Sequence, residues 1–435
     1  MNRIALVTHT TSYGAAAFVD ACRRAGTGVV LASDRCHVLD RSWHWPADSL
    51  VIDFSDADAA AAVIAAASDA AAPISAVLPV GGELPAKVAA AAARRLGLPA
   101  NAPAAMASTA NKLLMRGQLA AAAAANPAIR QPAFFAVACG TDPGEVADRV
   151  TAPGGVGFPC VVKPLMLSGS RGVMRADDRL SLVAAIARLE RLLADPAVRR
   201  PDPQAAGLLL VESFVAGPEF ALEGILTRGA LQILALFDKP DPLDGPTFEE
   251  TIYVTPSRLP ATDQARLAES VAAAARALGL ETGPVHAELR WTPGDDRPVL
   301  IEMAARPIGG LCARSLRFES GFSLEDVVVR HALGTGDVPA RIAGASGVMM
   351  IPTPARVPSA LRAVEGIEAA RAVAGIDDVV ISVRVGETLV PLPEGTSYTG
   401  FVFATGDDPG TVEQALRDAT ACLRFTVAPL VPVAR

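Results

Sequence analysis

Two glutamates in one predicted β-hairpin have the spacing of a metal site. Polar and apolar residues alternate through 286–290 and again through 299–303, which places Glu288 and Glu302 on the polar faces of two strands. The segment between them is rich in turn formers, and a hairpin symmetric about Asp295 sets the two glutamates opposite each other. Opposed carboxylates repel unless a cation lies between them, and Mg²⁺ takes such oxygen ligands. We therefore predict a magnesium site here; a shifted register with both side chains in solvent is the alternative.

A lysine followed by a loop of small residues is the second feature that allows chemistry. Lys163 ends the apolar run 158–163, and the loop after it contains Ser168, Gly169, Ser170, Arg171 and Gly172. Such a loop can fold over polyphosphate with backbone N–H donors while the lysine supplies a point charge. It is not a Walker A loop, because no Gly-Lys-Ser/Thr ends it. By itself the segment fits a phosphate loop or a plain turn. Lys112, near the start of a predicted helix, fits a phosphate contact or a solvated lysine.

The elements that carry these residues alternate between strand and helix. Near the N-terminus, strands at 3–8, 29–33 and 76–80 and helices at 15–25 and 85–96 predict a parallel α/β unit. A helix capped by Ser108 is expected over 108–125, and others over 178–194 and 263–278. Strands are expected at 208–214 and 219–226, with loops at 195–203 and 238–260. Short strands and one helix, 410–422, predict a small α+β module at the end.

Composition and charge exclude several classes of protein. The 435 residues are 51% hydrophobic and 20% charged, which is typical of a folded globular chain of several units. A net charge of −7 without a basic stretch argues against nucleic-acid or membrane-surface partners. The six cysteines show no Cys-x-x-Cys spacing, so we expect them to be reduced and mostly buried. Without a signal-like or membrane-spanning apolar run, a cytoplasmic location is expected.

Taken in order along the chain, several motifs resemble those of the ATP-grasp superfamily. They are Asn111-Lys112 with Met115-Arg116, the strand 158–164 with the loop 168–172, Val211-Glu212-Ser213-Phe214, Gly217-Pro218-Glu219-Phe220, and Glu302-Met303-Ala304-Ala305-Arg306. Their order and spacing carry the resemblance more than any single motif does. The resemblance covers the full chain, and within the superfamily it is to the L-amino-acid ligase branch.

That resemblance implies a multidomain fold of α/β and α+β units. A Rossmann-like preATP-grasp domain would occupy residues 1–104, followed by a two-part ATP-grasp core. The small subdomain of this core would span 105–208, and the large subdomain with the metal site would span 209–337. A small α+β module similar to that of L-amino-acid ligases would occupy 338–435.

The resemblance also implies residue roles in nucleotide and metal binding. Glu288 and Glu302 would hold Mg²⁺, with Mn²⁺ as a possible substitute, between the phosphates of ATP. The ATP contacts implied are the phosphate-binding Lys112 and Lys163, the loop Ser168, Gly169, Ser170, Arg171 and Gly172, the adenine hinge Glu212, Ser213, Phe214 and Val215, and the ribose-binding Glu219. Most of the superfamily has an asparagine ligand at the position of Ala304, so the number of metal ions stays open.

Two further residues are implied to act on the substrates. Arg306 lies four residues after Glu302, where its guanidinium would stabilise the transferring phosphoryl group and a tetrahedral intermediate; a structural salt bridge is the alternative. His286 matches a histidine that lies near the substrate in L-amino-acid ligases. Glu223 shares the strand face of Glu219 by parity, so it either lines the pocket or lies solvated at an edge.

The function implied is an ATP- and Mg²⁺-dependent carboxylate–amine ligase that forms an amide or peptide bond through an acyl phosphate. Its substrates would be small-molecule carboxylates and amines, with amino acids expected, and a homodimer is expected from relatives. The loops 168–172 and 238–260 would serve as lids. Glu249 and Glu250 in the second loop either recognise an amino group or are solvated. The alternatives are another ATP-grasp reaction, biotin-carboxylase-like or of the purine pathway, and a nucleotide-binding protein without turnover.

Overall fold

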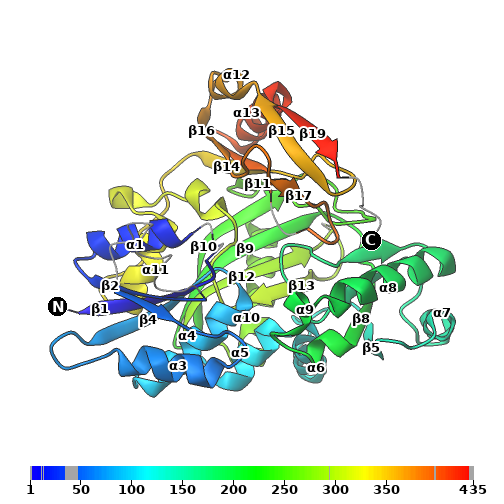
Figure 1. Cartoon of the computed structure of the whole chain (residues 1–435), viewed down its shortest axis with the longest axis horizontal. Helices are drawn as coiled ribbons and strands as arrows, with labels where there is room; N and C mark the ends of the chain where they lie inside the picture. The colour runs from blue at the N-terminus through cyan, green and yellow to red at the C-terminus, as the bar shows by residue number, and fades with distance from the viewer. Residues whose placement is uncertain are drawn as a thin grey trace.

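Four β-sheets organise the part of the chain that the structure describes, which is residues 2–10, 12, 14–34, 48–292, 294–395 and 398–430 of a computed structural model. Cys36, one of the cysteines predicted to be reduced, and Pro293, in the predicted hairpin turn, lie outside the described residues. Figure 1 places the N-terminal unit on one side, a long sheet in the middle, and the C-terminal module above it. The functional residues predicted from the sequence lie where these parts meet.

The N-terminal unit is the parallel α/β unit that the sequence predicts. Its sheet has the order β3-β2-β1-β4, with β1 Arg3–Thr8, β2 Gly28–Ser33, β3 Asp48–Val51 and β4 Ile74–Val80, and every pair is parallel. The helices are α1 Ala15–Arg24, α3 Ala57–Ala66 and α4 Glu83–Arg95. Gly81 and Gly82 join β4 to α4 with positive φ angles of 71° and 74°, which glycine adopts without strain. Because the strands are parallel, their carboxyl ends lie together at one edge of the sheet, and α/β proteins bind ligands at this edge.

The helix predicted over 108–125 is two helices. α5 Pro103–Ala110 ends at Asn111, and α6 Lys112–Ala123 starts there because the Asn111 side chain accepts hydrogen bonds from the backbone N–H groups of Leu113 and Leu114. The predicted cap, Ser108, was wrong: it lies inside α5, and its hydroxyl bonds the carbonyl of Ala104. Lys112 is nevertheless in the first turn of α6, as predicted.

A four-stranded antiparallel sheet of order β5-β8-β6-β7 follows. Its strands are β5 Phe134–Ala138, β6 Cys160–Pro164, β7 Met174–Ala176 and β8 Leu208–Ser213, covered by α7 Pro143–Thr151 and α8 Arg179–Ala194. α8 begins after the predicted Asp178, which caps it. The segment predicted as a loop contains α9 Pro196–Arg199 and is followed by the 3-10 turn η1 Ala205–Gly207. β8 starts at residue 208, at the boundary that the sequence predicts between the two subdomains. This boundary and the other domain boundaries stay predictions.

An eight-stranded sheet forms the centre of the molecule (Figure 1). Its order is β13-β12-β9-β10-β11-β14-β18-β16, with β9 Glu219–Thr227, β10 Ala230–Lys239, β11 Ile252–Thr255, β12 Gly283–Arg290, β13 Val299–Ala304, β14 Ala345–Ile351, β16 Ile376–Ile381 and β18 Gly400–Gly406. The expected loop over 238–260 was wrong, because β10 runs to Lys239 and β11 lies within the segment. The sheet contains strands from both sides of the predicted boundary at residue 337. Strands β14, β18 and β16 of the C-terminal module therefore extend the central sheet.

The remaining elements complete the central unit and the C-terminal module. They are α10 Ala261–Ala277, the 3-10 turns η2 Cys312–Ser315 and η3 Glu319–Gly321, α11 Leu324–Ala332, β15 Ser359–Glu365, α12 Ile367–Arg371, β17 Thr388–Leu389, α13 Pro409–Cys422 and β19 Arg424–Pro429. The order of the small sheet is β17-β15-β19. The described cysteines are free, and Cys22, Cys160 and Cys312 are buried. None of the described helices combines the length and hydropathy that crossing a membrane requires.

Candidate active site

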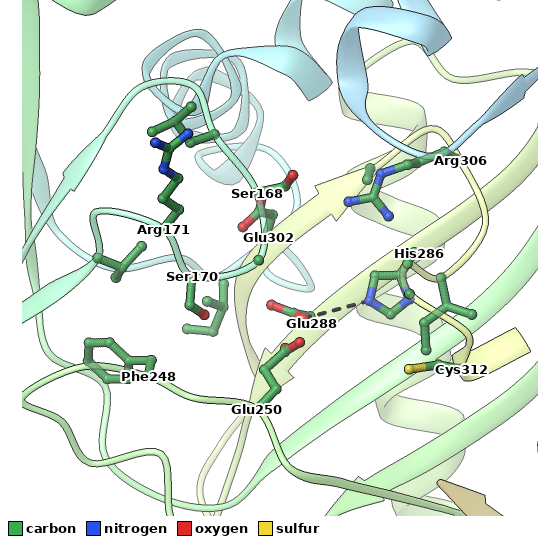
Figure 2. Close-up of a pocket in the computed structure, with 18 of the residues that line it drawn as sticks. Ser168, Ser170, Arg171, Phe248, Glu250, His286, Glu288, Glu302, Arg306 and Cys312 are labelled. Atoms are coloured by element: carbon green, nitrogen blue, oxygen red, sulfur yellow. Dashed lines mark ion pairs between the residues drawn. The ribbon is translucent and has the colours of Figure 1, made fainter. Parts of the chain in front are cut away.

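A cavity of about 460 Å³ lies where the N-terminal unit, the four-stranded sheet and the central sheet meet. One end, which we call the β6–β8 end, is lined by Lys163, residues 212–215 and the small-residue loop. The other, the α1–α11 end, is lined by residues of α1, the β4–α4 turn and α11. Between them lie Glu288, Glu302, His286 and Arg306, whose side chains Figure 2 shows around the same space.

The hairpin register is the one predicted from the alternation of residues. Glu288 pairs directly with Glu302 across β12 and β13, and the register shifts only beyond them, between Glu288 and Leu289. Each carboxylate has its own cation: Glu302 Oε1 lies 3.1 Å from Lys112 Nζ, and Glu288 Oε1 lies 3.5 Å from Lys239 Nζ. Burial by itself raises the pKa of Glu288, but the charges of Lys239 and His286 lower it well below its usual range.

Lys239 lies at the centre of an acidic cluster that no motif revealed. Its Nζ is 2.5 Å from Glu219 Oε1, 2.7 Å from Glu250 Oε1 and 3.5 Å from Glu288 Oε1. Burial lowers the pKa of Lys239, but the three carboxylates outweigh it and hold that pKa well above the usual value. The carboxylate oxygens lie within 4.8 Å of one another and are hard ligands, so Glu219, Glu250 and Glu288 fit a divalent cation as a donor set.

Glu250 is a largely buried acid in this cluster, with its side chain 16% exposed, and not a solvated loop residue. It accepts hydrogen bonds from Lys239 and from the hydroxyl of Tyr253, and it lines the cavity. Burial raises its pKa to about 7; the charge of Lys239 opposes this shift, and the charge of Glu288 adds to it. Glu249, in contrast, bonds the hydroxyl of Thr247 and is absent from the main cavity wall.

The predicted phosphate lysine belongs to a buried triad. Lys163 Nζ lies 2.5 Å from Glu212 Oε2, and Arg116 Nε lies 2.7 Å from Glu212 Oε1. Arg116 is fully buried and also donates to the carbonyl of Ile301 in β13, at 2.6 Å. Burial lowers the pKa of Lys163, whereas Arg116 and Lys163 overcome the effect of burial on Glu212 and lower the pKa of that carboxyl. The triad therefore ties α6, β8 and β6 to the metal-site hairpin.

The carboxylate of Glu219 already has two partners. Its Oε1 accepts from Lys239 and its Oε2 accepts from Arg290 Nε at 2.8 Å. Arg290 also lies over the ring of Phe214, with its Cζ 5.2 Å from the ring centroid. Ser213, Phe214 and Val215 all line the β6–β8 end, as the predicted hinge requires. A ribose bound by Glu219 would therefore share that carboxylate with Arg290 and Lys239.

The small-residue loop lies against the cavity except at its last member. Ser168, Gly169, Ser170 and Arg171 line the space, whereas the N–H of Gly172 bonds the carbonyl of Pro393 in the C-terminal module, at 2.8 Å. Gly172 has φ +78°, and a Cβ there would lie 3.0 Å from Leu189 and 3.1 Å from Pro164, so a glycine is needed. Lys112 holds the start of the loop by donating to the carbonyl of Leu167 at 2.8 Å.

His286 and Arg306 lie beside the predicted metal pair, and each has an acidic partner from another element. His286 Nδ1 is 3.1 Å from Glu223 Oε2, and Nε2 is 3.6 Å from Glu288 Oε1. Burial lowers the pKa of His286, but the two carboxylates prevail and raise it to about 9. Arg306 lines the cavity and also forms a salt bridge of 2.9 Å with Glu83 of α4. Arg306 therefore has both the cavity position and the structural salt bridge considered as its alternative.

Glu223 was placed wrongly by strand parity. It is fully buried behind His286, it does not line the cavity, and it is not solvated at a sheet edge. Its carboxylate accepts from His286 and from the backbone N–H of Ile308 at 3.1 Å. It thus holds the segment after β13 against β9.

The α1–α11 end was missed by sequence reasoning. Its walls include Phe18, Val80, Ile308, Leu324 and Met350, which belong to one hydrophobic cluster. None of these residues belongs to a motif that indicates chemistry, and they are spread over most of the length of the chain. Only the position of Gly81 and Gly82 after a parallel strand could have pointed here.

Comparisons with known proteins bear on this geometry. Residues 156–315 match the ATP-grasp domain, and residues 354–428 match the L-amino acid ligase C-terminal domain 2. The chain therefore contains an ATP-grasp domain over residues 156–315. The matched ATP-grasp segment contains Lys163, the small-residue loop, both hairpin glutamates and Arg306. ATP-grasp proteins bind ATP together with a divalent metal.

Two relatives of this chain are ligases by name. It is 33% identical to carnosine synthase 1 of Gallus gallus over 189 residues, which are 42% of this chain and 20% of that protein. It is 34% identical to the D-alanine–D-alanine ligase of Aromatoleum aromaticum over 163 residues, 37% of this chain and 47% of that one. The chain thus spans less than half of the length of either relative.

The fold as a whole is similar to that of a solved L-amino acid ligase from Bacillus licheniformis. The two share 24% of residues with a TM-score of 0.80, and the match covers 98% of each chain. The likeness extends from the N-terminal unit to the C-terminal module, which agrees with the predicted multidomain architecture.

Proposed function

We propose that this ATP-grasp protein is an ADP-forming carboxylate–amine ligase that joins small molecules, with amino acids as substrates, through an acyl phosphate. The observation that carries the proposal is the direct pairing of Glu288 with Glu302 in the same cavity wall as Lys163 and Arg306. The C-terminal match to L-amino acid ligases favours this reaction over a biotin-carboxylase-like or purine-pathway reaction.

Nucleotide binding would use the β6–β8 end. Lys163 and Lys112 would neutralise phosphate oxygens, residues 168–172 would donate backbone N–H groups, and the hinge 212–215 would receive the adenine. Glu288 and Glu302 would hold Mg²⁺, with the acidic cluster around Lys239 available to the same ion. When bound, Mg²⁺ supplies charge neutralisation for the transferring phosphoryl group. Because Lys239 already supplies a cation at this cluster, Ala304 in place of an asparagine ligand is compatible with one metal ion.

The proposed reaction has two steps, and the charged side chains in the middle of the cavity would stabilise both. A carboxylate oxygen of the first substrate attacks the γ-phosphorus of ATP, the bond to ADP breaks, and an acyl phosphate forms. The amine of the second substrate then attacks the acyl carbon, the amine loses its proton, and phosphate leaves. Arg306, and His286 in its protonated form, would stabilise the negative charge that develops on the carbonyl oxygen. The loop 168–172 would exclude water that would otherwise hydrolyse the acyl phosphate.

The test of this proposal is amino-acid-dependent formation of ADP. The chain is incubated with ATP and Mg²⁺ and with pairs drawn from the common amino acids, and ADP and the condensed product are both measured. ADP formed only with a reactive pair, together with a product of matching mass, is expected. Retained ATP binding without amino-acid-dependent ADP or product would refute the ligase proposal for those substrates and favour a binding protein.

The proposal extends to the setting in which the reaction takes place. We place the protein in the cytoplasm as a homodimer that acts on small molecules, without nucleic-acid or membrane partners. Light scattering after size-exclusion chromatography measures the subunit number, and a monomeric mass would overturn the dimer.

A further inference from the structure

A carboxylate without a partner lies at the α1–α11 end of the cavity. Glu325, the second residue of α11, is only 5% exposed and lines the cavity. Within the described parts of the chain, no side chain or backbone group forms a hydrogen bond or an ion pair with its carboxylate. Burying an ionised carboxylate without a counterion is costly, so the position calls for a cation that the described residues do not supply.

The other glutamates in the cavity wall show how unusual this is. Each of them is paired with at least one lysine, arginine or histidine side chain at 3.6 Å or less; they are Glu212, Glu219, Glu250, Glu288 and Glu302. Among the described residues, each of these five glutamates therefore has a counterion from the protein itself. Glu325 is more buried than Glu250, Glu288 and Glu302, whose side chains are 16%, 18% and 28% exposed, yet the described residues give it no counterion.

The neighbouring charged side chains Arg24 of α1 and Asp326 of α11 form a salt bridge with each other. Arg24 is near enough to be affected by the charge of Glu325, yet its Nε and Nη2 bond the two carboxylate oxygens of Asp326, each at 2.8 Å. Asp326 also completes the capping box with Ser323. The first-turn position of Glu325 is favourable at a helix N-terminus, but such stabilisation is modest and does not require the side chain to line a cavity.

His9 and Ser12, beside Gly82 and Gly81, also line the cavity, but His9 Nδ1 lies 3.2 Å from Asp34 Oδ2 and the Ser12 hydroxyl donates to the carbonyl of Val80. Five other described side chains at this end are apolar. Phe18, Val80, Ile308, Leu324 and Met350 surround the same space and offer neither a charge nor a hydrogen-bonding side chain. A cation that reaches Glu325 would therefore be carried on a hydrocarbon body, because the carbon atoms of such a ligand bury their surface against these walls. Inorganic cations lack that body, and the single carboxylate gives them few ligands.

We propose that the α1–α11 end binds the positively charged nitrogen of a substrate and that Glu325 selects for it. This inference rests on the proposed ligase function, since it defines the substrate class of that site as amino acids or amines with a cationic nitrogen on an aliphatic body. The nitrogen is either the α-ammonium group or a side-chain ammonium group, and both offer Glu325 the same charge-assisted hydrogen bond.

Binding measurements distinguish the two sources without any turnover. Calorimetry with the full chain uses lysine, norleucine, 6-aminohexanoate and hexanoate, which carry both ammonium groups, only the α-group, only the terminal group, and neither. Glu325→Gln is expected to weaken the cationic probes about 10- to 100-fold and to leave hexanoate unchanged. A loss for lysine and 6-aminohexanoate assigns the terminal group, and a loss for lysine and norleucine assigns the α-group.

A matched control separates this effect from the effect of a charge at a helix start. Glu145 occupies the first turn of α7, is exposed, and lies outside the cavity, so Glu145→Gln is expected to leave all four affinities unchanged. If Glu325→Gln does not fold, the wild-type affinities provide the second test, because each cationic probe should bind more tightly than hexanoate.

Two results would overturn the inference. One is affinities for all cationic probes that stay within about twofold of wild type in Glu325→Gln. The other is a wild-type chain that binds the cationic probes no more tightly than hexanoate. Because these measurements need no ATP hydrolysis, binding that depends on Glu325 without ADP formation would reject the ligase proposal and keep this site. Ligation that ignores Glu325 would do the reverse.

Discussion

Glutamates line both ends of the cavity, but among the described residues those toward the β6–β8 end and the hairpin have protein counterions, whereas Glu325 has none. Glu212 lies between Lys163 and Arg116, whereas Glu325 at the α1–α11 end has an apolar surround and no partner among the described residues. The first arrangement holds Lys163 at the cavity wall, where we propose that it binds a phosphate of ATP. The second leaves a carboxylate that we propose binds the cationic nitrogen of a substrate. The difference suggests that the common reaction and the substrate choice are encoded in separate parts of the fold.

The largest expected effect comes from the hairpin between the two ends. In Glu302→Gln, loss of one carboxylate should lower turnover about 1000-fold, because several kcal/mol of charge stabilisation are removed. The side chain of Glu302 is 28% exposed, so folding should be retained. ADP formation and the melting temperature are measured together. Glu319→Gln, which changes an exposed glutamate, is the control, and wild-type turnover in Glu302→Gln would contradict the metal assignment.

A smaller effect, on the affinity for ATP, is expected from a substitution at the β6–β8 end. Lys163→Met should raise KM for ATP about 100-fold, because a buried phosphate contact is lost while Glu212 keeps Arg116 as its partner. KM for the amino-acid substrates should change much less, which would sharpen the separation between the two ends. Lys87→Met on α4, outside the cavity wall, is the control. An unaltered ATP affinity would count against a phosphate role for Lys163.

Arg116 should act on the same end indirectly, with an effect of about tenfold. Arg116→Lys keeps a charge but loses the two-pronged contact to Glu212 and the bond to Ile301, so Lys163 should be positioned less firmly. We expect KM for ATP to rise while KM for the amino acids stays constant. Arg116→Met should be worse than Arg116→Lys in the same assay. Equal changes in every kinetic constant would identify Arg116 as a general stabiliser instead.

The smallest effect is a stability change at the α1–α11 end. Asp326→Asn should destabilise the fold by about 1–2 kcal/mol at pH 7, since it removes the charge that holds Arg24. Burial raises the pKa of Asp326, but Arg24 and Ser323 lower it below its usual value. The carboxylate therefore contributes stability above pH 4, and this contribution is lost as pH falls through the lowered pKa. Denaturant unfolding at pH 7 and pH 3 should show a difference between wild type and variant at pH 7 that shrinks at pH 3.

Local sequence patterns predicted the hairpin chemistry because the relevant information is local. Strand alternation fixes which face a side chain takes, and a short turn fixes the register, so the pairing of Glu288 with Glu302 follows from a few consecutive residues. The same reasoning failed for Glu223, because parity gives a face of the strand and not what packs against that face. It also failed at Asn111, where a side-chain cap ends one helix and starts the next.

The remaining partners come from elements far apart in the chain. Glu83 reaches Arg306, and Lys239 reaches Glu288, only because helices and strands separated along the sequence pack against one cavity. No periodicity or motif relates such pairs, since their proximity results from sheet order and domain packing. Glu325 is the clearest case: its residue type is ordinary for a first helical turn, and it is notable only because it is buried without a counterion in the part of the chain that the structure describes.

By itself, the sequence determined the order of the strands and helices around the site, the opposed glutamates, the lysine before its loop, and the resemblance to a superfamily. These depend on residue spacing along one or two adjacent elements. Only the tertiary structure decided which charges are neutralised and which are left for a ligand. Whether a carboxylate has a counterion depends on every chain segment within a few ångströms, and those segments are brought together by folding.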